Sequence, residues 1–320
     1  MALQAVKSVY NMHCQRGDPQ KLEYTLEETT MKKLIALVLI AMMAVLTLGC
    51  AKKEAVVDNP LGLIEPGKLS VALSPDFAPM EFIDTSKSGQ EQFVGFDVTL
   101  AKFIASELGL ELEIKPMSFD ASQTAVQLGK VDMSISGYSW TKERAENYCL
   151  SDYYYAGDNE TQQTIIVPVD KAGTFAKLED FQGLKIGAQA ASLQENLCNE
   201  NLTGIVASIE LFKDINDAVL AMKTGKIDAI AVAYGNGEAI IASNSDVGMS
   251  GFLFEIDESA ENNVCMLNKN STALLAKVNE CLKKAYDGKL YGGWYDEAKE
   301  LSGIATAADI SYDDEGNVAG

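Results

Sequence analysis

The segment with the clearest chemistry runs from Ser136 to Arg144 and reads SGYSWTKER. An apolar, strand-like run leads into this hydroxyl-rich turn, and Thr141 can cap a helix that has Arg144 in its first turn. Backbone N–H groups at a helix start, hydroxyl groups and a guanidinium all suit an anion, and a guanidinium can hold a carboxylate through two parallel hydrogen bonds. The segment therefore indicates a carboxylate site, or else a surface arginine paired with Glu143 or Glu146, and its residues alone favour neither interpretation.

Strand-like runs and helical patterns alternate around this segment. We expect Asp97 to be the N-cap of the first helix and Gly109 to end that helix. The alternation is typical of an α/β fold with a mostly parallel sheet. The expected elements are strands at 69–73, 112–115 and 131–136 and helices at 97–108 and up to about Leu128.

The pattern then recurs. The motif GKVD at Gly129–Asp132 is echoed by GKID at Gly225–Asp228, and each copy follows an apolar helix and precedes an apolar strand. Two similar α/β units predict two lobes with a cleft between them, where ligands commonly bind near the carboxyl ends of strands. Strands of the second unit are expected at 185–188, 205–209 and 227–232.

Composition narrows the possible functions. The 320 residues, of which 47% are hydrophobic, can bury one large core or two modest ones. The 46 acidic and 26 basic residues give a net charge of −20, which repels phosphate backbones, so nucleic acid is not an expected partner. His13 is the only histidine and lies in an N-terminal leader, so the mature chain would have no histidine for catalysis or metal binding. We expect no catalytic residue, no metal and no cofactor, although carboxylate, lysine or tyrosine chemistry would still be open.

Residues 31–50 read MKKLIALVLIAMMAVLTLGC and have the parts of a secretory signal: two lysines, an apolar run and Gly49-Cys50. The apolar run is shorter than the ~20 residues of a membrane-spanning helix. Its end resembles a bacterial lipobox, with Thr47 where leucine is usual. The resemblance implies that Cys50 carries a lipid and that the protein is exported and anchored to the outer face of the cell membrane, or periplasmic. An ordinary signal peptide followed by a chance cysteine is the alternative.

This leader divides the chain. Met31 is the natural start, so residues 1–30 are interpreted as a spurious extension, 31–49 as a lipoprotein signal peptide and 50–67 as a flexible tether. Residues 303–320 are expected to form an acidic tail. No cysteine forms a CxxC pair, which argues against a zinc ribbon or a thioredoxin-type site. Four cysteines of the body can be buried thiols or disulfides: Cys149, Cys198, Cys265 and Cys281.

Several short segments follow one another along the body in a recognisable order. They are Phe77–Phe82 (FAPMEF), Val94–Val98 (VGFDV), Lys115–Phe119 (KPMSF), Gly129–Asp132, Ser136–Arg144, Ser151–Tyr155 (SDYYY) and Leu184–Gly187 (LKIG). Through them the chain resembles, over nearly the whole body, the periplasmic solute-binding proteins of amino-acid ABC importers, family 3 type. The resemblance implies a two-lobed, type II periplasmic-binding-protein fold with two crossover strands forming a hinge. Lobe 1 would hold 68–160 and 260–302, and lobe 2 would hold 161–259.

The same resemblance implies partners and site residues. The partners are a small amino acid or related carboxylate and an ABC permease in the membrane, and the protein would be a monomer. Arg144 would grip the α-carboxylate of the ligand, the rings of Phe77 and Phe119 would sandwich the ligand, and the loop 189–194 would reach it from lobe 2. The expected ligand-binding residues are Phe77, Phe119, Ser136, Gly137, Ser139, Arg144, Gln189, Ser192, Ala233 and Tyr234.

One position departs from the family pattern. Members that take α-amino acids usually have an aspartate where this chain has Ala233, and an acidic residue is common at Ser74. Because a buried ammonium without acceptors is costly, either Glu238 or Asp76 supplies the charge or the ligand lacks a standard α-ammonium group. Tyr234 could fill the space with an aromatic face.

Three functions are compatible with these features. The leading hypothesis is a non-enzymatic binding protein that captures a carboxylate-bearing solute by lobe closure and delivers it to a permease. The second is an enzyme on the same fold, similar to a prephenate or arogenate dehydratase, because fold does not settle function. The third is a sensor whose closed form is read by a receptor, with the same binding chemistry.

Overall fold

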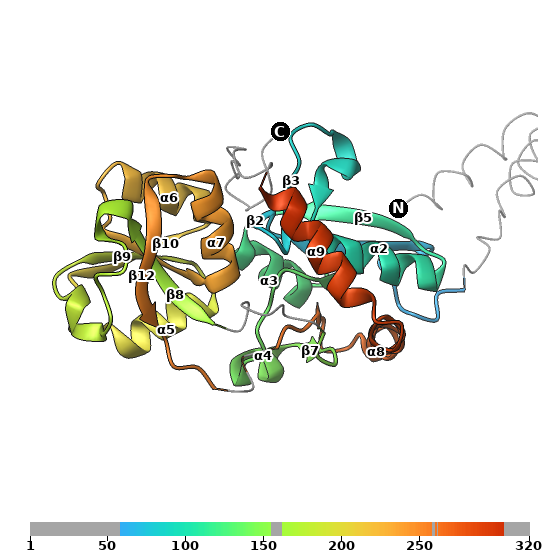
Figure 1. Cartoon of the computed structure of the whole chain (residues 1–320). Helices are drawn as coiled ribbons and strands as arrows, with labels where there is room; N and C mark the ends of the chain where they lie inside the picture. Colours follow the sequence, from blue (N-terminus) through green and yellow to red (C-terminus); the bar gives the residue numbers. More distant parts are fainter. Residues whose placement is uncertain (1–57, 155–161, 258–259, 261, 304–320) are drawn as a thin grey trace, which may run out of the picture. The chain divides into compact units, whose positions relative to one another are not determined.

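The computed structural model describes residues 58–154, 162–257, 260 and 262–303 (Figure 1). The predicted signal peptide, Cys50, residues 50–57 of the predicted tether and nearly all of the predicted acidic tail lie outside the described residues. Residues 58–67 of the predicted tether are described, and Leu63 among them is buried in a hydrophobic core, so this part is not a free tether. Within the described residues, strands and helices alternate as the sequence patterns predict, and the strands form two five-stranded sheets and one small sheet.

The first sheet has the strand order β5-β1-β6-β13-β7. Strand β1 pairs in parallel with β5 and β6, whereas β13 pairs antiparallel with β6 and β7. Its strands are β1 (Lys68–Leu73), β5 (Glu111–Pro116), β6 (Met133–Ser134), β7 (Cys149–Leu150) and β13 (Met266–Leu267). Its helices are α2 (Phe96–Leu108), α3 (Phe119–Gln127), α4 (Lys142–Asn147), α8 (Thr272–Asp287) and α9 (Leu290–Ser302). We call this sheet with its helices the first unit. It includes a three-stranded sheet of β2 (Asp76–Phe77), β3 (Glu81–Ile83) and β4 (Phe93–Val94).

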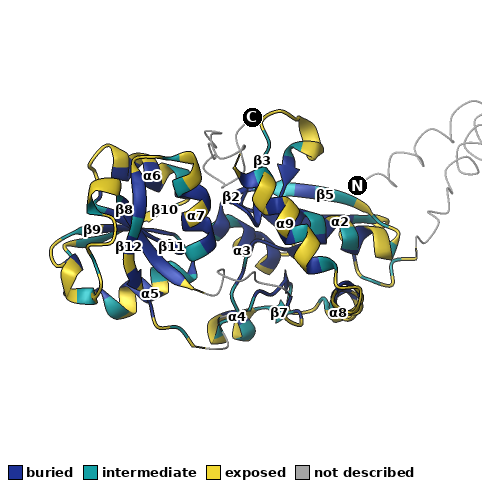
Figure 2. Cartoon of the chain, in the orientation of Figure 1, coloured by how far each residue is buried: buried dark blue, intermediate teal, exposed yellow. Residues whose placement is uncertain are grey.

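The second sheet has the order β10-β9-β11-β8-β12 and forms the second unit. Strand β9 pairs in parallel with β10 and β11, and β8 is antiparallel to both of its neighbours. Figure 2 shows that most of its strands are buried, while its helices have exposed outer faces. Its elements are β8 (Gln163–Pro168), β9 (Lys185–Gln189), β10 (Ser208–Phe212), β11 (Ala229–Ala233), β12 (Val247–Leu253), α5 (Leu193–Asn201), α6 (Ile215–Lys223) and α7 (Tyr234–Ser243).

The chain crosses between the two units twice, once between β7 and β8 and once between β12 and β13. The two crossings lie side by side at Tyr154 and Asn263, which form an antiparallel bridge. Each unit has its own hydrophobic core.

The repeated GK-[VI]-D motif has the same structural role in both units. Gly129 and Gly225 adopt left-handed backbone angles, with φ of 66° and 72°, that end the preceding helix. The motif aspartate then ties down the start of the neighbouring strand: Asp132 accepts from the backbone N–H of Ser70 at 2.8 Å, and Asp228 accepts from that of Lys185 at 2.8 Å. The sequence repeat therefore marks a turn that sets strand register, and not a binding motif.

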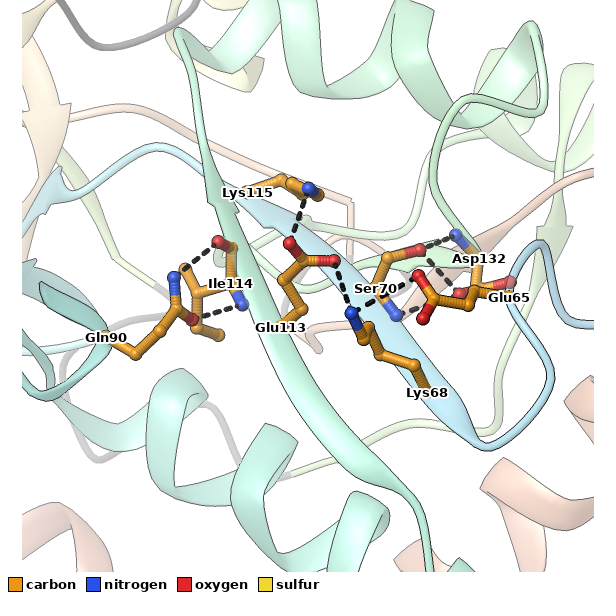
Figure 3. Close-up of polar contacts among 8 residues, drawn as sticks. All are labelled: Glu65, Lys68, Ser70, Gln90, Glu113, Ile114, Lys115 and Asp132. Atoms are coloured by element: carbon orange, nitrogen blue, oxygen red, sulfur yellow. Dashed lines mark hydrogen bonds and ion pairs between the residues drawn. The ribbon is translucent and has the colours of Figure 1, made fainter.

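Figure 3 shows the polar contacts around β1 and the edge strand β5. The side-chain amide of Gln90 accepts from the backbone N–H of Ile114 at 2.6 Å and donates to its carbonyl at 3.1 Å, which satisfies the free edge of β5. Beside it, Lys68 lies 3.2 Å from Glu65 and 3.9 Å from Glu113. These pairs are near the surface and add little stability.

The structure corrects several sequence-based expectations. Gly95, with φ of 117°, is the N-cap of α2, and Asp97 is instead fully buried inside the first turn. A Cβ at Gly95 would lie 2.4 Å from the carbonyl oxygen of Met80, so only glycine fits there. The strand expected at 131–136 is only Met133–Ser134, because the chain turns at Ser136 toward the pocket described below. The strand expected at 205–209 begins three residues later, because the backbone N–H groups of Ile205 and Val206 both donate back to the Leu202 carbonyl in the turn after α5.

The four cysteines of the body are free thiols, of which three are buried. Burial raises the pKa of Cys198 to about 12, which makes that thiol unreactive. We expect the unfolded, non-reduced protein without its leader and Cys50 to react with four equivalents of a thiol reagent. The native protein should react chiefly at the half-buried Cys149. A count of two thiols or fewer after unfolding would show a disulfide and contradict this structure.

Candidate functional site

A small cavity lies between the two units, and ten residues line it. Six of them come from the first unit, and four come from the loop and helix start at 189–194 of the second unit. The space between them is about 20 Å³, which is room for about one water molecule, so a larger solute can enter only if the walls move apart. The lining residues are Phe77, Phe119, Ser136, Gly137, Ser139, Arg144, Gln189, Ser192, Leu193 and Gln194.

Arg144 is the only charged residue of this lining and is 6% exposed. It stands in the first turn of α4, where the Thr141 side chain caps the helix by accepting from its backbone N–H at 3.1 Å. Its Nη1 donates to the carbonyl of Ser139 at 2.8 Å, and its Nη2 donates across the cavity to the carbonyl of Ala191 at 3.1 Å.

No ion pair among the described residues includes Arg144. Burial lowers the pKa of its guanidinium, yet an arginine remains protonated in proteins. Two rings flank the guanidinium carbon, Phe119 at 5.7 Å and Tyr138 at 5.2 Å from their centroids. A buried cation that only carbonyl dipoles and rings stabilise would gain strongly from an anion beside it.

Aromatic rings form the walls on the first-unit side. Phe119 and Tyr138 pack with their ring centroids 4.9 Å apart, and Tyr138 is fully buried with its hydroxyl bonded to Ser122 and Ser134. The Phe77 ring lies against Gly137, where a Cβ would be only 2.6 Å from its Cε1 atom. Gly137 has φ of 54°, so this turn needs glycine both for its backbone angle and for the close ring.

The second-unit side is fixed by its own hydrogen bonds. Ser192 caps α5 by accepting from Glu195 N–H at 3.1 Å, and its hydroxyl donates to the carbonyl of Gln189 at 2.7 Å. Gln194 Nε2 donates to Gln163 Oε1 at 2.6 Å. Because Ser192 already uses its single hydroxyl proton, it can act toward a solute mainly through its position at the start of α5.

Ala233 and Tyr234 do not line the cavity. Ala233 ends β11, is 2% exposed and stands at the N-cap position of α7, which Tyr234 begins. It pairs with Gln163 on the neighbouring strand, whose side chain holds the pocket residue Gln194. Gln163 therefore lies between Ala233 and the lining residue Gln194, and contact of Ala233 or Tyr234 with a solute remains a prediction.

The two acids considered as partners for an ammonium group also lie outside the lining. Asp76 is buried, and three donors already hold it: the Ser74 hydroxyl at 2.7 Å, Gln189 Nε2 at 2.8 Å and the Ile215 N–H at 2.8 Å. Glu238 is exposed on α7. Asp76 thus links the first unit to the second, because Gln189 and Ile215 belong to the second unit.

Comparison with known proteins agrees with this arrangement. The profile of the family described as bacterial extracellular solute-binding proteins, family 3, matches residues 69–297. The chain belongs to this family. Among its relatives are the arginine-binding extracellular protein ArtP of Bacillus subtilis, 30% identical over 71% of this chain and 86% of that protein, and a probable histidine-binding protein of Campylobacter jejuni, 29% identical over 73% and 90%.

Solved structures of family 3 solute-binding proteins show the same fold. An amino acid ABC transporter substrate-binding protein, AbpA of Streptococcus pneumoniae, solved bound to L-arginine, aligns with a TM-score of 0.67 and 32% identity over 74% of this chain and 96% of that one. An ancestral arginine-binding protein bound to glutamine aligns with a TM-score of 0.64 and 30% identity over 73% and 98%. The fold is thus the predicted two-lobed, type II α/β fold.

The structure brings eight of the ten predicted site residues to this solute-binding protein's cavity and adds Leu193 and Gln194, which follow the Ser192 cap. The sequence signal for both was their position in the loop expected to reach the ligand. Glu81 and Asp97, behind the turn at Ser136 and Gly137, were not predicted as functional. In the sequence, each is an acidic residue inside an otherwise apolar segment, and this feature could have indicated a buried acid.

The described residues contain no helix that is both long enough and apolar enough to cross a bilayer. The same residues contain no group of three or more histidine, cysteine, aspartate or glutamate side chains suited to a metal ion. The lining of the cavity itself offers the Arg144 guanidinium, amides, hydroxyls and rings.

Buried acids should make the stability of this family 3 protein depend on pH. Burial raises the pKa of Asp76 to about 6, of Asp97 to about 7 and of Asp214 to about 8, all above the 3.8 of a free aspartate. A raised folded-state pKa means that the folded chain binds more protons than the unfolded chain, so the contribution of these groups to stability is greatest below about pH 4 and is lost as pH rises through about 6 to 8. We expect the free energy of unfolding to fall by about 2 kcal/mol or more between about pH 5 and about pH 8.5, which lowers the melting temperature by about 5 °C.

Asp214→Asn is the matched control for this prediction. Asp214 caps α6 by accepting from the Asn216 N–H at 2.6 Å, and asparagine caps a helix equally well. The variant should therefore fold and show a smaller drop in melting temperature with rising pH. A melting temperature that rises between those pH values in the wild type would be inconsistent with these buried acids.

Proposed function

We propose that this protein captures a small solute bearing a carboxylate, most simply an amino acid or a derivative, and delivers it to an ABC permease. The observation that carries the proposal is Arg144, a buried cation without an acidic partner among the described residues, at the meeting point of the two units. A solute carboxylate would replace the weaker contact of Nη2 with the Ala191 carbonyl and form two charge-assisted bonds.

Lobe closure is the proposed mode of capture, with 68–160 and 260–302 moving as one lobe and 161–259 as the other. We expect hydrogen bonds across the two units to break and reform during this motion. The Ala191 carbonyl accepts from both Arg144 and Gln123 at 3.1 Å, and Asn236 donates to the Ala78 carbonyl at 3.0 Å. A solute that contacts both walls favours the closed state by its differential affinity for that state.

The lining residues suggest fewer contacts for the amine end of the solute than for its carboxylate end. The lining offers neutral acceptors, among them the Gln189 and Gln194 amides, and no carboxylate among its residues. Both open alternatives therefore remain as proposals: an ammonium met by an acid that moves on closure, such as Asp76, or a solute without a standard α-ammonium group. Matched pairs of solutes distinguish the two.

Calorimetric titration of purified protein tests the proposal. The panel would contain L-arginine, L-histidine and L-cystine, the amino acids named for relatives, each beside an analogue that lacks the α-amino group. We expect at least one carboxylate to bind. Equal affinity for both members of a pair would favour the solute without an ammonium contact, and the absence of binding by every carboxylate would refute the proposed function.

We also propose binding without turnover. The same incubations, analysed by chromatography, should return the solute unchanged, whereas steady conversion of prephenate or arogenate would establish the enzymatic alternative.

Export and anchoring complete the proposal. Residues 31–49 would be removed as a signal peptide, and Cys50 would carry a lipid that holds the monomer at the outer face of the membrane through residues 50–57. Cells fed a labelled fatty acid should incorporate it into the wild-type protein and not into Cys50→Ala. Equal labelling of the two would contradict the lipid anchor.

A further inference from the structure

Two buried carboxyl groups lie behind the wall of the solute cavity. Glu81 in β3 and Asp97 in the first turn of α2 are both fully buried. Each one holds a cavity residue: the Ser136 hydroxyl donates to Glu81, and the Gly137 N–H donates to Asp97 at 2.6 Å. The geometry of this turn therefore depends on two acids that do not touch the cavity themselves.

One oxygen of each acid, Glu81 Oε2 and Asp97 Oδ1, has no hydrogen-bond partner. The two acids also interact electrostatically, since burial and the charge of Asp97 raise the pKa of Glu81. Two adjacent carboxyl groups in a buried site do not both ionise readily, and a single proton between them would satisfy both unpartnered oxygens.

The surroundings indicate which acid keeps the proton. Asp97 Oδ2 accepts from two donors, the Gly137 N–H and the Tyr154 hydroxyl at 3.1 Å, which favours its ionised form. Burial raises the pKa of Asp97 only to about 7, whereas burial and the charge of Asp97 together raise the pKa of Glu81 well above its usual value.

The other titratable groups around the pair agree with this assignment. Asp76 adds negative charge that disfavours ionisation of Glu81, and the raised pKa values of Tyr154 and Cys265 keep both of these neutral at pH 7. No ion pair among the described residues includes either acid.

We propose that Glu81 and Asp97 are positioning residues of the solute site that share one proton at neutral pH, with Glu81 as the neutral donor and Asp97 as the anion that fixes Gly137. This inference rests on the proposed function in one respect, namely that Ser136 and Gly137 face the solute. The same assignment indicates which groups remain free to donate hydrogen bonds to the solute. The Gly137 N–H and the Ser136 proton are used inside the chain, which leaves Arg144 as the principal donor to a carboxylate.

Two variants with the same chemical change, Glu81→Gln and Asp97→Asn, test the assignment. If Glu81 is already neutral, glutamine replaces it with a donor of similar shape, and affinity for the best-bound solute of the amino-acid panel should fall less than in Asp97→Asn. Asparagine at 97 loses the charge-assisted acceptor of Gly137, and affinity should fall by about tenfold.

The NMR chemical shift of the Gly137 amide proton should be followed against pH in the solute-free protein. This shift would show no pH-dependent step near neutral pH if the two acids only supported the fold. In the wild type it should titrate once, near the pH of about 7 at which Asp97 takes up a proton. Glu81→Gln should keep this step, and Asp97→Asn should abolish it. A step shifted to about pH 4 in the wild type, or retained in Asp97→Asn, overturns the inference.

If either variant fails to fold, a measurement on the wild-type protein still tests the inference. The side-chain carboxyl carbons of the wild type should show Glu81 protonated at pH 7, and an ordinary glutamate titration near about pH 4.3 would overturn the inference. Because these NMR readings need no solute, failure of every panel compound to bind would refute the proposed function and leave the shared proton tested separately.

Discussion

Replacing Arg144 by alanine should weaken solute binding by about a hundredfold or more. The carboxylate of the solute would then be buried without a charged partner, and breaking a buried ion pair by removing one member costs about 3–5 kcal/mol. The unbound variant should keep or slightly raise its melting temperature, because the guanidinium has no acidic partner among the described residues. Calorimetric titration and a thermal melt measure the two effects.

Lys142→Ala provides the matched control. Lys142 stands two residues away on the same helix, is exposed, and its removal changes the net charge by the same amount. We expect its affinity to equal that of the wild type. If Arg144→Ala binds as tightly as Lys142→Ala, Arg144 does not hold the carboxylate, and the assignment of this cavity is wrong.

The second large effect is expected at Gly137. Alanine there would place Cβ 2.6 Å and 2.9 Å from two atoms of the Phe77 ring, at a backbone φ of 54° that disfavours any side chain. The ring and the turn must both shift, so we expect a loss of about 2 kcal/mol in the free energy of unfolding and at least about a tenfold loss of affinity. Denaturant unfolding and calorimetry measure them.

Gly129→Ala separates backbone strain from the clash. Gly129 has a similar φ of 66°, and no atom lies within 4 Å of the position of its Cβ. This variant should lose about 1 kcal/mol of stability from the strained backbone and bind normally. Equal affinities of the two glycine variants would show that the contact between Phe77 and Gly137 does not shape the site.

The fold could be predicted from the sequence because its signals are local. Alternating strand and helix patterns, together with the repeated GK-[VI]-D turn, predicted both units, and Gly109 ends α2 in the left-handed conformation as expected. The misplaced features depend on distant contacts. Asp97 looked like a helix cap, but the carbonyl of Met80 leaves room only for glycine at 95, and the carboxylate turns inward to Gly137.

The site could be predicted where the residue type carries the chemistry. Arg144, Phe77 and Phe119 meet at the cavity as the resemblance implied. No sequence signal shows that Gly137 N–H and the Ser136 hydroxyl are held by Asp97 and Glu81, since these partners are 40 and 55 residues away along the chain. Likewise, only packing shows that Ala233 lies outside the cavity lining.

The buried positive charge of Arg144 is only partly neutralised by its neighbours. Arg144 faces the cavity with carbonyl partners only, while the acids Asp76, Glu81 and Asp97 are held behind the wall by hydroxyl, amide and backbone donors. Burial and the charge of Asp97 raise the pKa of Glu81, which limits the negative charge behind the wall and leaves the field of Arg144 available to an incoming anion.

A crystal structure of the protein with the best-bound solute of the panel tests the central claim most directly. We expect both carboxylate oxygens to lie about 2.8 Å from the guanidinium nitrogens of Arg144, with the solute between the rings of Phe77 and Phe119 and the Ala191 carbonyl displaced from Nη2. A solute bound elsewhere, or bound here with Arg144 still on the Ala191 carbonyl and no carboxylate beside it, would contradict the account.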